Sequence, residues 1–314
     1  MGSQPVVVVT VNYRLGALGF LYSKSVEGNF GVQDQILALK WVQANIGAFG
    51  GDASAVTIDG QSAGGSSVAY HLLNKGSAGL FHRAIMQSNP VSLPFKEDTD
   101  GRKLGDLFAK HLGCKADDLV CLRNASVDQV LQAQHDAQQH FNPLIPLDVF
   151  LPWTPTVGTG PTSLPQQPLY MFQTGQIANR VPLVTGVVAN ESMIFVYQGL
   201  GADPSEALYL AFLTDVFGIH AADVLLHYPP REGGRTILHS LSLLGTDFIM
   251  ACPARVVATA FSQFTSAFLY YFDHVMSFSQ AAWGPSYSEC YNLTCHGEEL
   301  AFIFGSAGLV IPNA

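Results

Sequence analysis

The sequence is poor in charged residues, and above all in basic ones. Lys and Arg account for 15 of the 314 residues, against 24 Asp and Glu, which gives a formal net charge of −9. Binding to the phosphates of a nucleic acid requires clustered Lys and Arg side chains, so this composition argues against a nucleic-acid partner. Because 48% of the residues are hydrophobic and 12% are charged, the chain predicts a large packed interior and not a disordered protein.

Long uninterrupted hydrophobic runs are scarce as well. The most apolar stretch, residues 5–21, is broken by Asn12, Tyr13 and Arg14, so we expect no segment that spans a bilayer. Residues 1–4 lack a basic region and lead directly into an apolar run, which does not predict a signal peptide.

The five cysteines include two closely spaced pairs, Cys114 with Cys121 and Cys290 with Cys295. As a disulfide, each pair would close a small loop and would raise the free energy of unfolding by about 2–2.5 kcal/mol, because it restricts the unfolded chain. Reduced thiols are the alternative. A zinc site is less favoured because neither pair has the C-x2-C spacing of such sites, and we expect no metal and no cofactor.

One short segment carries the strongest chemical signal. Residues 56–58 are β-branched and predict a strand, residues 64–75 predict a helix, and Gly60-x-Ser62-x-Gly64 lies between them. This pattern is the nucleophile elbow, in which a strained strand-to-helix turn exposes a serine. A glycine on each side has no Cβ and avoids collisions in the turn. The segment therefore predicts that Ser62 is a nucleophile.

The residues around this elbow extend the signal. Residues 49–65 read F-G-G, a four-residue spacer, V-T-I and then G-Q-S-A-G-G. This string resembles the serine active-site signature of the type-B carboxylesterases, the cholinesterase-like branch of the α/β-hydrolases. The resemblance continues through residues 7–16, 28–42 and 80–88 and runs the length of the chain. It implies an α/β-hydrolase fold and ester hydrolysis.

The order of apolar segments predicts an α/β fold independently of that resemblance. Besides 56–58, strands are expected at 6–11, 84–86, 181–188 and 267–272, and helices at 33–46, 64–75 and over most of 204–264. Alternating strands and helices are typical of a doubly wound, mainly parallel sheet. We expect one incomplete α/β-hydrolase domain over residues 1–314, with residues 91–180 and 200–265 as helical and loop insertions over the site.

A serine hydroxyl needs a base, and the base needs a carboxylate that fixes its tautomer. In this fold both follow the serine, the acid before the histidine. Glu191, at the exit of the strand at 181–188, is the predicted acid. A solvated loop glutamate is the alternative, because the family motif D-E-G reads N-E-S here.

Among ten histidines, His296 is the predicted base. Its segment H-G-E-E-L-A-F-I-F resembles the family's catalytic-histidine loop, whereas an arbitrary histidine is more often structural. Ala63, directly after the nucleophile, is the predicted oxyanion-hole donor through its backbone N–H.

Further residues are assigned supporting roles, with Gly60, Gly64, Gln61 and Ser88 expected around the nucleophile. Ser88 is predicted to hydrogen-bond to the triad or else to be an ordinary loop residue. Gln61 stands where cholinesterases carry glutamate, and because a choline cation favours carboxylates and aromatic faces, Gln61 argues against choline esters.

The resemblance also implies structural pairs. Arg14 and Asp52 resemble a structural ion pair of the family. If this pair is buried, removing one partner would destabilise the fold. Extracellular members carry a disulfide with the spacing of Cys114 and Cys121, and the partner of Cys252 in disulfide-bonded relatives lies nearer the C-terminus. A secretory route is also favoured by N-glycosylation sequons at Asn124, Asn190 and Asn292.

Together these patterns predict a serine carboxylic-ester hydrolase that forms an acyl-enzyme intermediate on small-molecule carboxylic esters. The family's H-G-G-G-type oxyanion loop does not precede residue 6, and relatives continue beyond the histidine loop, so we expect a piece of a longer esterase. A non-catalytic cholinesterase-like adhesion or structural protein, or an inactive esterase fragment, is the alternative. The acyl and alcohol specificity and the oligomeric state do not follow from the sequence.

Overall fold

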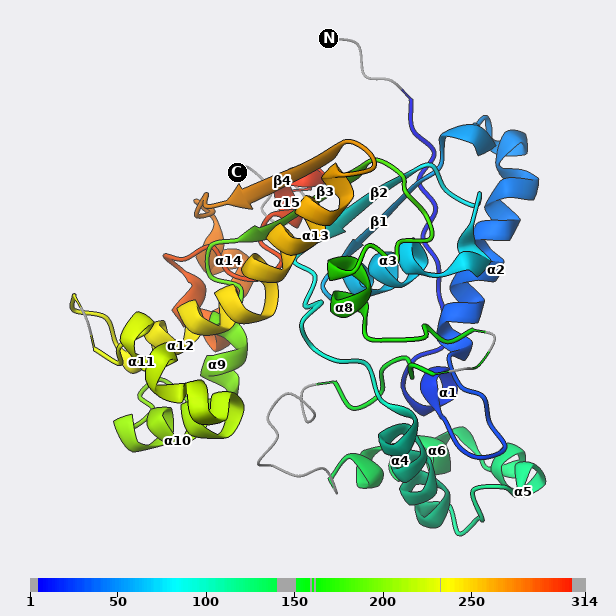
Figure 1. Ribbon diagram of the computed structural model, residues 1–314, viewed down its shortest axis with the longest axis horizontal. Helices are drawn as coiled ribbons and strands as arrows, with labels where there is room; N and C mark the ends of the chain where they lie inside the picture. Colours follow the sequence, from blue (N-terminus) through cyan, green and yellow to red (C-terminus); the bar gives the residue numbers. More distant parts are fainter. Residues whose placement is uncertain (1–4, 140–150, 159, 161, 232, 307–314) are drawn as a thin grey trace. The chain divides into compact units, whose positions relative to one another are not determined.

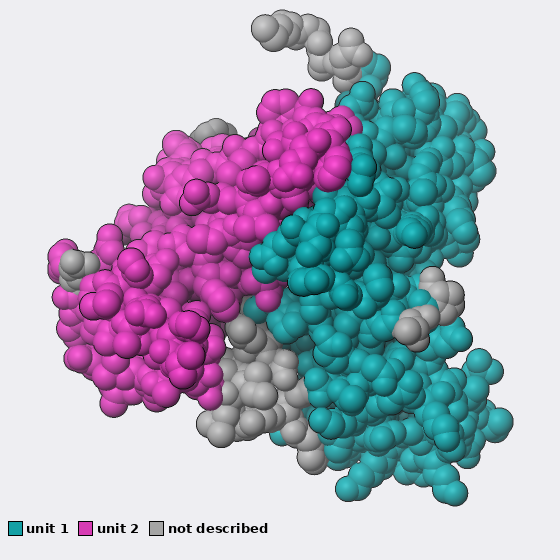
Figure 2. All heavy atoms as spheres, in the orientation of Figure 1, with its two compact units in different colours: residues 1–58, 69–84, 93–181 teal, residues 59–68, 85–92, 182–314 magenta. Residues whose placement is uncertain are grey.

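The computed structural model describes residues 5–139, 151–158, 160, 162–231 and 233–306 (Figure 1). The chain divides into two compact units (Figure 2). Unit 1 comprises residues 1–58, 69–84 and 93–181, and unit 2 comprises residues 59–68, 85–92 and 182–314. The expectation of a single domain stays a prediction.

The sheet has four strands in the order β1-β2-β3-β4. They are β1 (Thr57–Gln61), β2 (Arg83–Gln87), β3 (Leu183–Val188) and β4 (Ala267–Phe272). Strands β3 and β4 lie side by side in parallel (Figure 1), with Leu183 opposite Ala267 and Val188 opposite Phe272. The parallel pairing and the alternation with helices confirm the predicted α/β class.

Unit 1 contains the first group of helices. Its helices are α1 (Gly16–Phe20), α2 (Phe30–Asn45), α4 (Asp98–His111), α5 (Leu119–Asn124), α6 (Val127–Gln138) and α8 (Pro168–Gln173), with single turns η1 (Ile46–Phe49), η2 (Ala53–Ala55) and η3 (Lys75–Ser77). Ser126 and Gln129 form a capping box that satisfies the free N–H groups at the start of α6. A buried apolar cluster joins α1, α4 and α6: Ala17, Leu104, Phe108, Val130, Ala133 and Ala137.

The apolar run at residues 6–11 does not form the predicted buried strand. Val6 and Val8 are 78% and 76% exposed, and the run is extended chain outside the sheet. A β-branched run becomes a buried strand only where neighbouring strands supply ladder hydrogen bonds and covering side chains. Within the described residues, no strand pairs with this run, so the prediction is wrong here.

Arg14 pairs with Asp34 and not, as predicted, with Asp52. The Arg14 Nε and Nη2 atoms each donate to the Asp34 carboxylate over 2.7 Å. The Arg14 hydrogen bond holds the pKa of Asp34 below its usual range. Asp52 instead caps η2 by accepting hydrogen bonds from the backbone N–H and the hydroxyl of Ser54. A short acidic side chain readily bonds to a free N–H two residues ahead, and this local bond occupies Asp52.

Unit 2 holds β3, β4 and the second group of helices. These are α9 (Met193–Leu200), α10 (Glu206–Phe217), η4 (Gly218–His220), α11 (Ala221–His227), α12 (Ile237–Gly245), the π-helical turn η5 (Thr246–Ala251), α13 (Cys252–Ser262), α14 (Ser279–Trp283), η6 (Pro285–Cys290) and α15 (Leu300–Ile303). Helices α10 and α12 pack through a buried apolar cluster: Tyr209, Leu213, Ile237, Leu241 and Leu244.

Two helical segments of unit 2 are long and apolar enough to cross a membrane, judged by length and composition alone. In the segment Ile237–Ser262, 44% of the apolar window is buried inside the protein, and a core helix of a soluble protein meets the same criteria of length and composition. The segment Glu206–His227 is 11% buried but contributes Tyr209 and Leu213 to the core of the unit. The expected absence of a membrane span therefore stays a prediction.

Candidate active site

The predicted nucleophile occupies a strained turn. Ser62 follows β1 and precedes α3 (Ala63–Leu73), and its φ of 58° lies in the left-handed region that residues with a Cβ rarely adopt. The turn is held because the Ser62 N–H donates to the Gln87 carbonyl oxygen at the end of β2, over 2.9 Å. A strained serine between a strand and a helix is the geometry of a nucleophile elbow.

Only one of the two elbow glycines is required sterically. A Cβ on Gly60 would lie 2.2 Å from the carbonyl oxygen of Gly64, which is a collision with backbone. A Cβ on Gly64 would meet no described atom within 4 Å. The expectation that both glycines prevent collisions is therefore correct for Gly60 and wrong for Gly64. Gly65 is also crowded, because its Cβ would approach the Gln87 carbonyl oxygen to 3.0 Å.

The two glycines offer a matched test of this turn. We expect Gly60→Ala to lower the free energy of unfolding by about 1–3 kcal/mol, the usual cost of forcing an atom into packed structure. Gly64→Ala, at the start of α3, is expected to be neutral or to stabilise by up to about 1 kcal/mol, because alanine loses less entropy in a helix. Urea unfolding followed by circular dichroism measures both, and equal midpoints for the two variants would contradict the assignment.

The predicted acid is buried and faces the predicted base. Glu191 follows β3, and its side chain is 0% exposed. Its Oε1 atom accepts the backbone N–H of Val188 over 2.9 Å, and its Oε2 atom lies 2.5 Å from Nδ1 of His296. The alternative of a solvated loop glutamate is therefore excluded. The His296 side chain is 8% exposed, so this contact is largely shielded from water.

The loops that carry the acid and the base are joined to each other. The Asn190 N–H donates to the Thr294 carbonyl oxygen over 2.9 Å, and Asn190 forms a parallel bridge with Cys295. The Cys290–Cys295 disulfide closes the segment directly before His296, and both sulfur-bearing residues are buried. The loop thus holds His296 at the exit of β3 although 105 residues separate it from Glu191.

Both predicted disulfides are present. Cys114, which follows α4, is joined to Cys121 in α5, with Cα atoms 5.8 Å apart, and Cys290 and Cys295 have Cα atoms 5.7 Å apart. Cys252, at the start of α13, is an exposed free thiol in the described chain. These findings favour the disulfide interpretation of the two pairs over that of reduced thiols.

Two buried carboxyl groups close in sequence to the predicted base were not assigned from the sequence. Glu298 accepts the backbone N–H groups of Cys295, over 2.7 Å, and of Met276, over 2.9 Å, and so fastens the histidine loop. Glu299 is 0% exposed, and burial, reinforced by the nearby charge of Glu191, raises its pKa. The sequence did offer a signal for them, two consecutive glutamates inside an apolar string. A glutamate is rarely buried without a partner, so such a pair indicates a specific contact.

Ser88 contacts Glu299 and not the predicted triad. It follows β2 with a φ of 47°, its N–H donates to the Gly186 carbonyl oxygen, and its hydroxyl lies 3.4 Å from the Glu299 Oε1 atom. Among the described residues, no hydrogen bond joins Ser88 to Ser62, Glu191 or His296. Its expected bond to the triad is thus replaced by a bond to the neighbouring carboxyl group.

Gln61 makes a further polar contact with the predicted base. Its Nε2 atom lies 3.1 Å from Nε2 of His296, and the Phe195 ring packs edge-on to the imidazole with centroids 5.1 Å apart. Ala63 is the first residue of α3, and the first N–H groups of a helix have no partner within it. Ser62, Gln61, Ala63, Glu191 and His296 all belong to unit 2.

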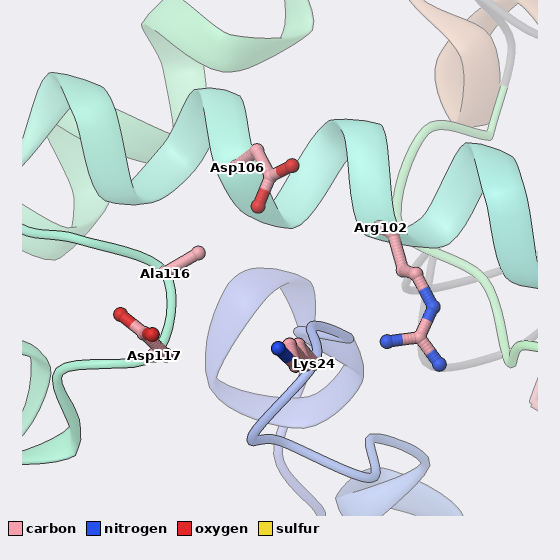
Figure 3. A pocket seen from close by; sticks show the side chains of 5 residues that line it. All are labelled: Lys24, Arg102, Asp106, Ala116 and Asp117. Carbon is pink, nitrogen blue, oxygen red and sulfur yellow. The ribbon is translucent and has the colours of Figure 1, made fainter.

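A cavity of about 400 Å³ in unit 1 contains none of these residues (Figure 3). It is lined by Lys24, Arg102, Asp106, Ala116 and Asp117. Charges of both signs line it, so it selects for neither anions nor cations, and we assign it no role. Among the residues that the structure describes, no group of three or more His, Cys, Asp or Glu side chains is placed to hold a metal ion.

The chain is similar in sequence to known proteins, some of which are named as esterases. The chain is 36% identical over 307 residues to the cAMP-regulated D2 protein of Dictyostelium discoideum, covering 97% of this chain and 56% of that protein. It is 32% identical over 305 residues to the para-nitrobenzyl esterase of Bacillus subtilis (strain 168), covering 96% and 58%. The chain therefore spans little more than half the length of these relatives.

The fold gives the same result. The structure of a thermophilic PNB esterase superimposes with a TM-score of 0.73 at 29% identity, over 94% of this chain and 57% of that one. The α/β-hydrolase fold expected from the family resemblance is thereby confirmed. The model of the carboxylesterase family matches residues 1–310, nearly the whole chain. With the elbow, the sheet and the family model in agreement, this protein belongs to the carboxylesterase family.

Proposed function

We propose that this chain carries the catalytic centre of a serine carboxylic-ester hydrolase, with Ser62 as nucleophile, His296 as base and Glu191 as acid. The observation that supports the proposal best is the buried contact of 2.5 Å between Glu191 Oε2 and His296 Nδ1. This pair lies in the same unit as the strained elbow serine, and membership of the carboxylesterase family makes ester hydrolysis the expected chemistry.

The proposed reaction has two halves. In the first, Ser62 Oγ attacks the ester carbonyl carbon while its proton passes to Nε2 of His296, and the N–H of Ala63 stabilises the oxyanion. The imidazolium, held by Glu191, then gives this proton to the leaving alcohol, which leaves an acyl-Ser62 ester. In the second half, water attacks that ester and loses a proton to His296, and the imidazolium then gives this proton to Ser62 Oγ as the acyl–oxygen bond breaks and the carboxylic acid departs.

The residues of the chain could perform these steps without a metal ion or cofactor. The substrates are proposed to be small-molecule carboxylic esters, without choline because position 61 lacks a carboxylate. Two disulfides and the sequons at Asn124, Asn190 and Asn292 support a secretory route for the protein, because disulfides persist in oxidising compartments.

Covalent labelling tests the nucleophile directly. We expect a fluorophosphonate to add one covalent group per chain, measured as intact mass, because only an activated serine displaces the fluoride. Ser62→Ala should abolish the adduct, and the matched control Ser262→Ala, at the exposed end of α13, should retain it. If the intact chain, shown to be folded by circular dichroism, forms no adduct, the non-catalytic or inactive-fragment alternative replaces this proposal.

A further inference from the structure

The contact between Glu191 and His296 determines which nitrogen of the imidazole carries the proton. An ionised carboxylate can only accept hydrogen bonds. The Glu191 Oε1 atom is already used by the Val188 N–H, and the Oε2 atom faces Nδ1 over 2.5 Å. Nδ1 must therefore carry the hydrogen, and in the neutral ring Nε2 is a bare acceptor.

Gln61 presents a donor to that bare nitrogen. The atom of Gln61 that faces Nε2 over 3.1 Å is the amide nitrogen, which can donate. The opposite orientation of the amide would bring its oxygen lone pairs against the lone pair of Nε2. Among the described residues, no hydrogen bond joins the Ser62 hydroxyl to Nε2, so the lone pair that the base needs is occupied by Gln61.

The histidine loop and an aromatic ring border this contact. Gln61 is the last residue of β1, and a Cβ on Gly297 would lie 3.7 Å from the same amide nitrogen, an ordinary contact distance, so the histidine loop passes directly beside Gln61. Gly297 has a φ of 86°, in the left-handed region that residues with a Cβ rarely adopt. On another side, the Phe195 ring contacts the imidazole edge-on and restricts its rotation.

We propose that Gln61 is a positioning residue of the base, whose amide holds the Nε2 lone pair of His296 in the resting site and must release it before Ser62 can transfer its proton. This inference rests on the function proposed above. When the proton reaches Nε2, two N–H donors would face each other, so the amide has to turn away during each acylation. Gln61 therefore slows the attack of Ser62 while it aligns the imidazole.

The ¹⁵N chemical shift of Nε2 in His296 tests this arrangement without any need for activity. An unprotonated ring nitrogen that loses a hydrogen bond moves downfield. We expect a downfield shift in Gln61→Leu, which removes the donor at similar size, and no shift in Ser62→Ala or in the matched control Gln198→Leu. Gln198 is exposed on α9, where its amide donates to the Tyr287 hydroxyl. An unchanged signal in Gln61→Leu, or a shifted one in Ser62→Ala, would overturn the inference.

The rate of fluorophosphonate labelling gives a second readout. A neutral hydrogen bond is worth about 0.5–1.5 kcal/mol, so freeing Nε2 in Gln61→Leu should raise the second-order labelling rate by about two- to tenfold. Gln198→Leu should label at the wild-type rate. A slower rate in Gln61→Leu would overturn the inference, since the amide would then assist the base. If no variant labels at all, the proposed function has failed, and the nitrogen shifts still decide the role of Gln61.

Discussion

Replacing His296 by alanine is expected to lower kcat for a small ester such as p-nitrophenyl acetate by about 10⁶-fold, as removal of the base does in other serine hydrolases. A serine hydroxyl at neutral pH is a poor nucleophile and needs a base, and His296 is the base that we propose. The residual rate would come from the oxyanion donors and from substrate binding alone. Initial rates at saturating ester measure the change.

The exposed His220 provides the control for that substitution. It lies in η4 of the same unit, and its ring is 3.8 Å from the exposed Asp223 carboxylate. His220→Ala should therefore leave kcat unchanged. If His296→Ala lowers kcat by less than tenfold while the chain remains folded, His296 is not the base.

Replacing Glu191 by glutamine is expected to lower kcat by about 10⁴-fold, although the side chain keeps its size. The Val188 N–H requires an acceptor, which places the glutamine oxygen where Oε1 now lies. The amide NH₂ group must then face Nδ1 of His296 and forces the proton onto Nε2. In this tautomer the base has no lone pair for the Ser62 proton, which is the effect known from the equivalent change in other triads.

Non-additivity separates this effect from simple loss of structure. The double variant Glu191→Gln, His296→Ala should be no slower than His296→Ala, because the acid acts only through the base. The exposed Glu206, at the start of α10, is the matched control, and Glu206→Gln should retain the wild-type kcat. If the losses of the two single variants multiply in the double variant, Glu191 acts separately from His296 and the triad assignment is wrong.

The parts of the site that could be predicted from sequence are those encoded by neighbouring residues. The elbow is one continuous segment, so its strand, strained serine and helix follow from a single short string. The strand at 267–272 was predicted at its observed bounds because it is apolar throughout and ends at charged or polar residues. Strand β1 was predicted too short, since it continues through Asp59 and Gly60, which have low strand propensity but are held by the ladder.

The contacts that could not be predicted depend on packing between distant segments. Arg14 has several acidic candidates within 40 residues, and only the fold shows that Asp34 faces it while Asp52 is used locally. The Gln61 contact with His296 joins residues 235 positions apart and depends on one amide rotamer. The burial of Glu298 likewise involves the Met276 N–H, and that of Glu299 the Ser88 hydroxyl, groups of other segments that no local pattern reports.

The Cys290–Cys295 disulfide makes part of the support of the histidine loop dependent on the oxidation of two thiols. The ring that it closes ends at the residue before His296, so this covalent support of the histidine loop exists only after two thiols have been oxidised. Disulfides form and persist in oxidising compartments and are rare where thiols are kept reduced. A chain synthesised in a reducing cytosol would therefore carry every residue of the proposed site and hold the histidine loop by hydrogen bonds alone. The covalent part of that support is in this sense acquired after translation.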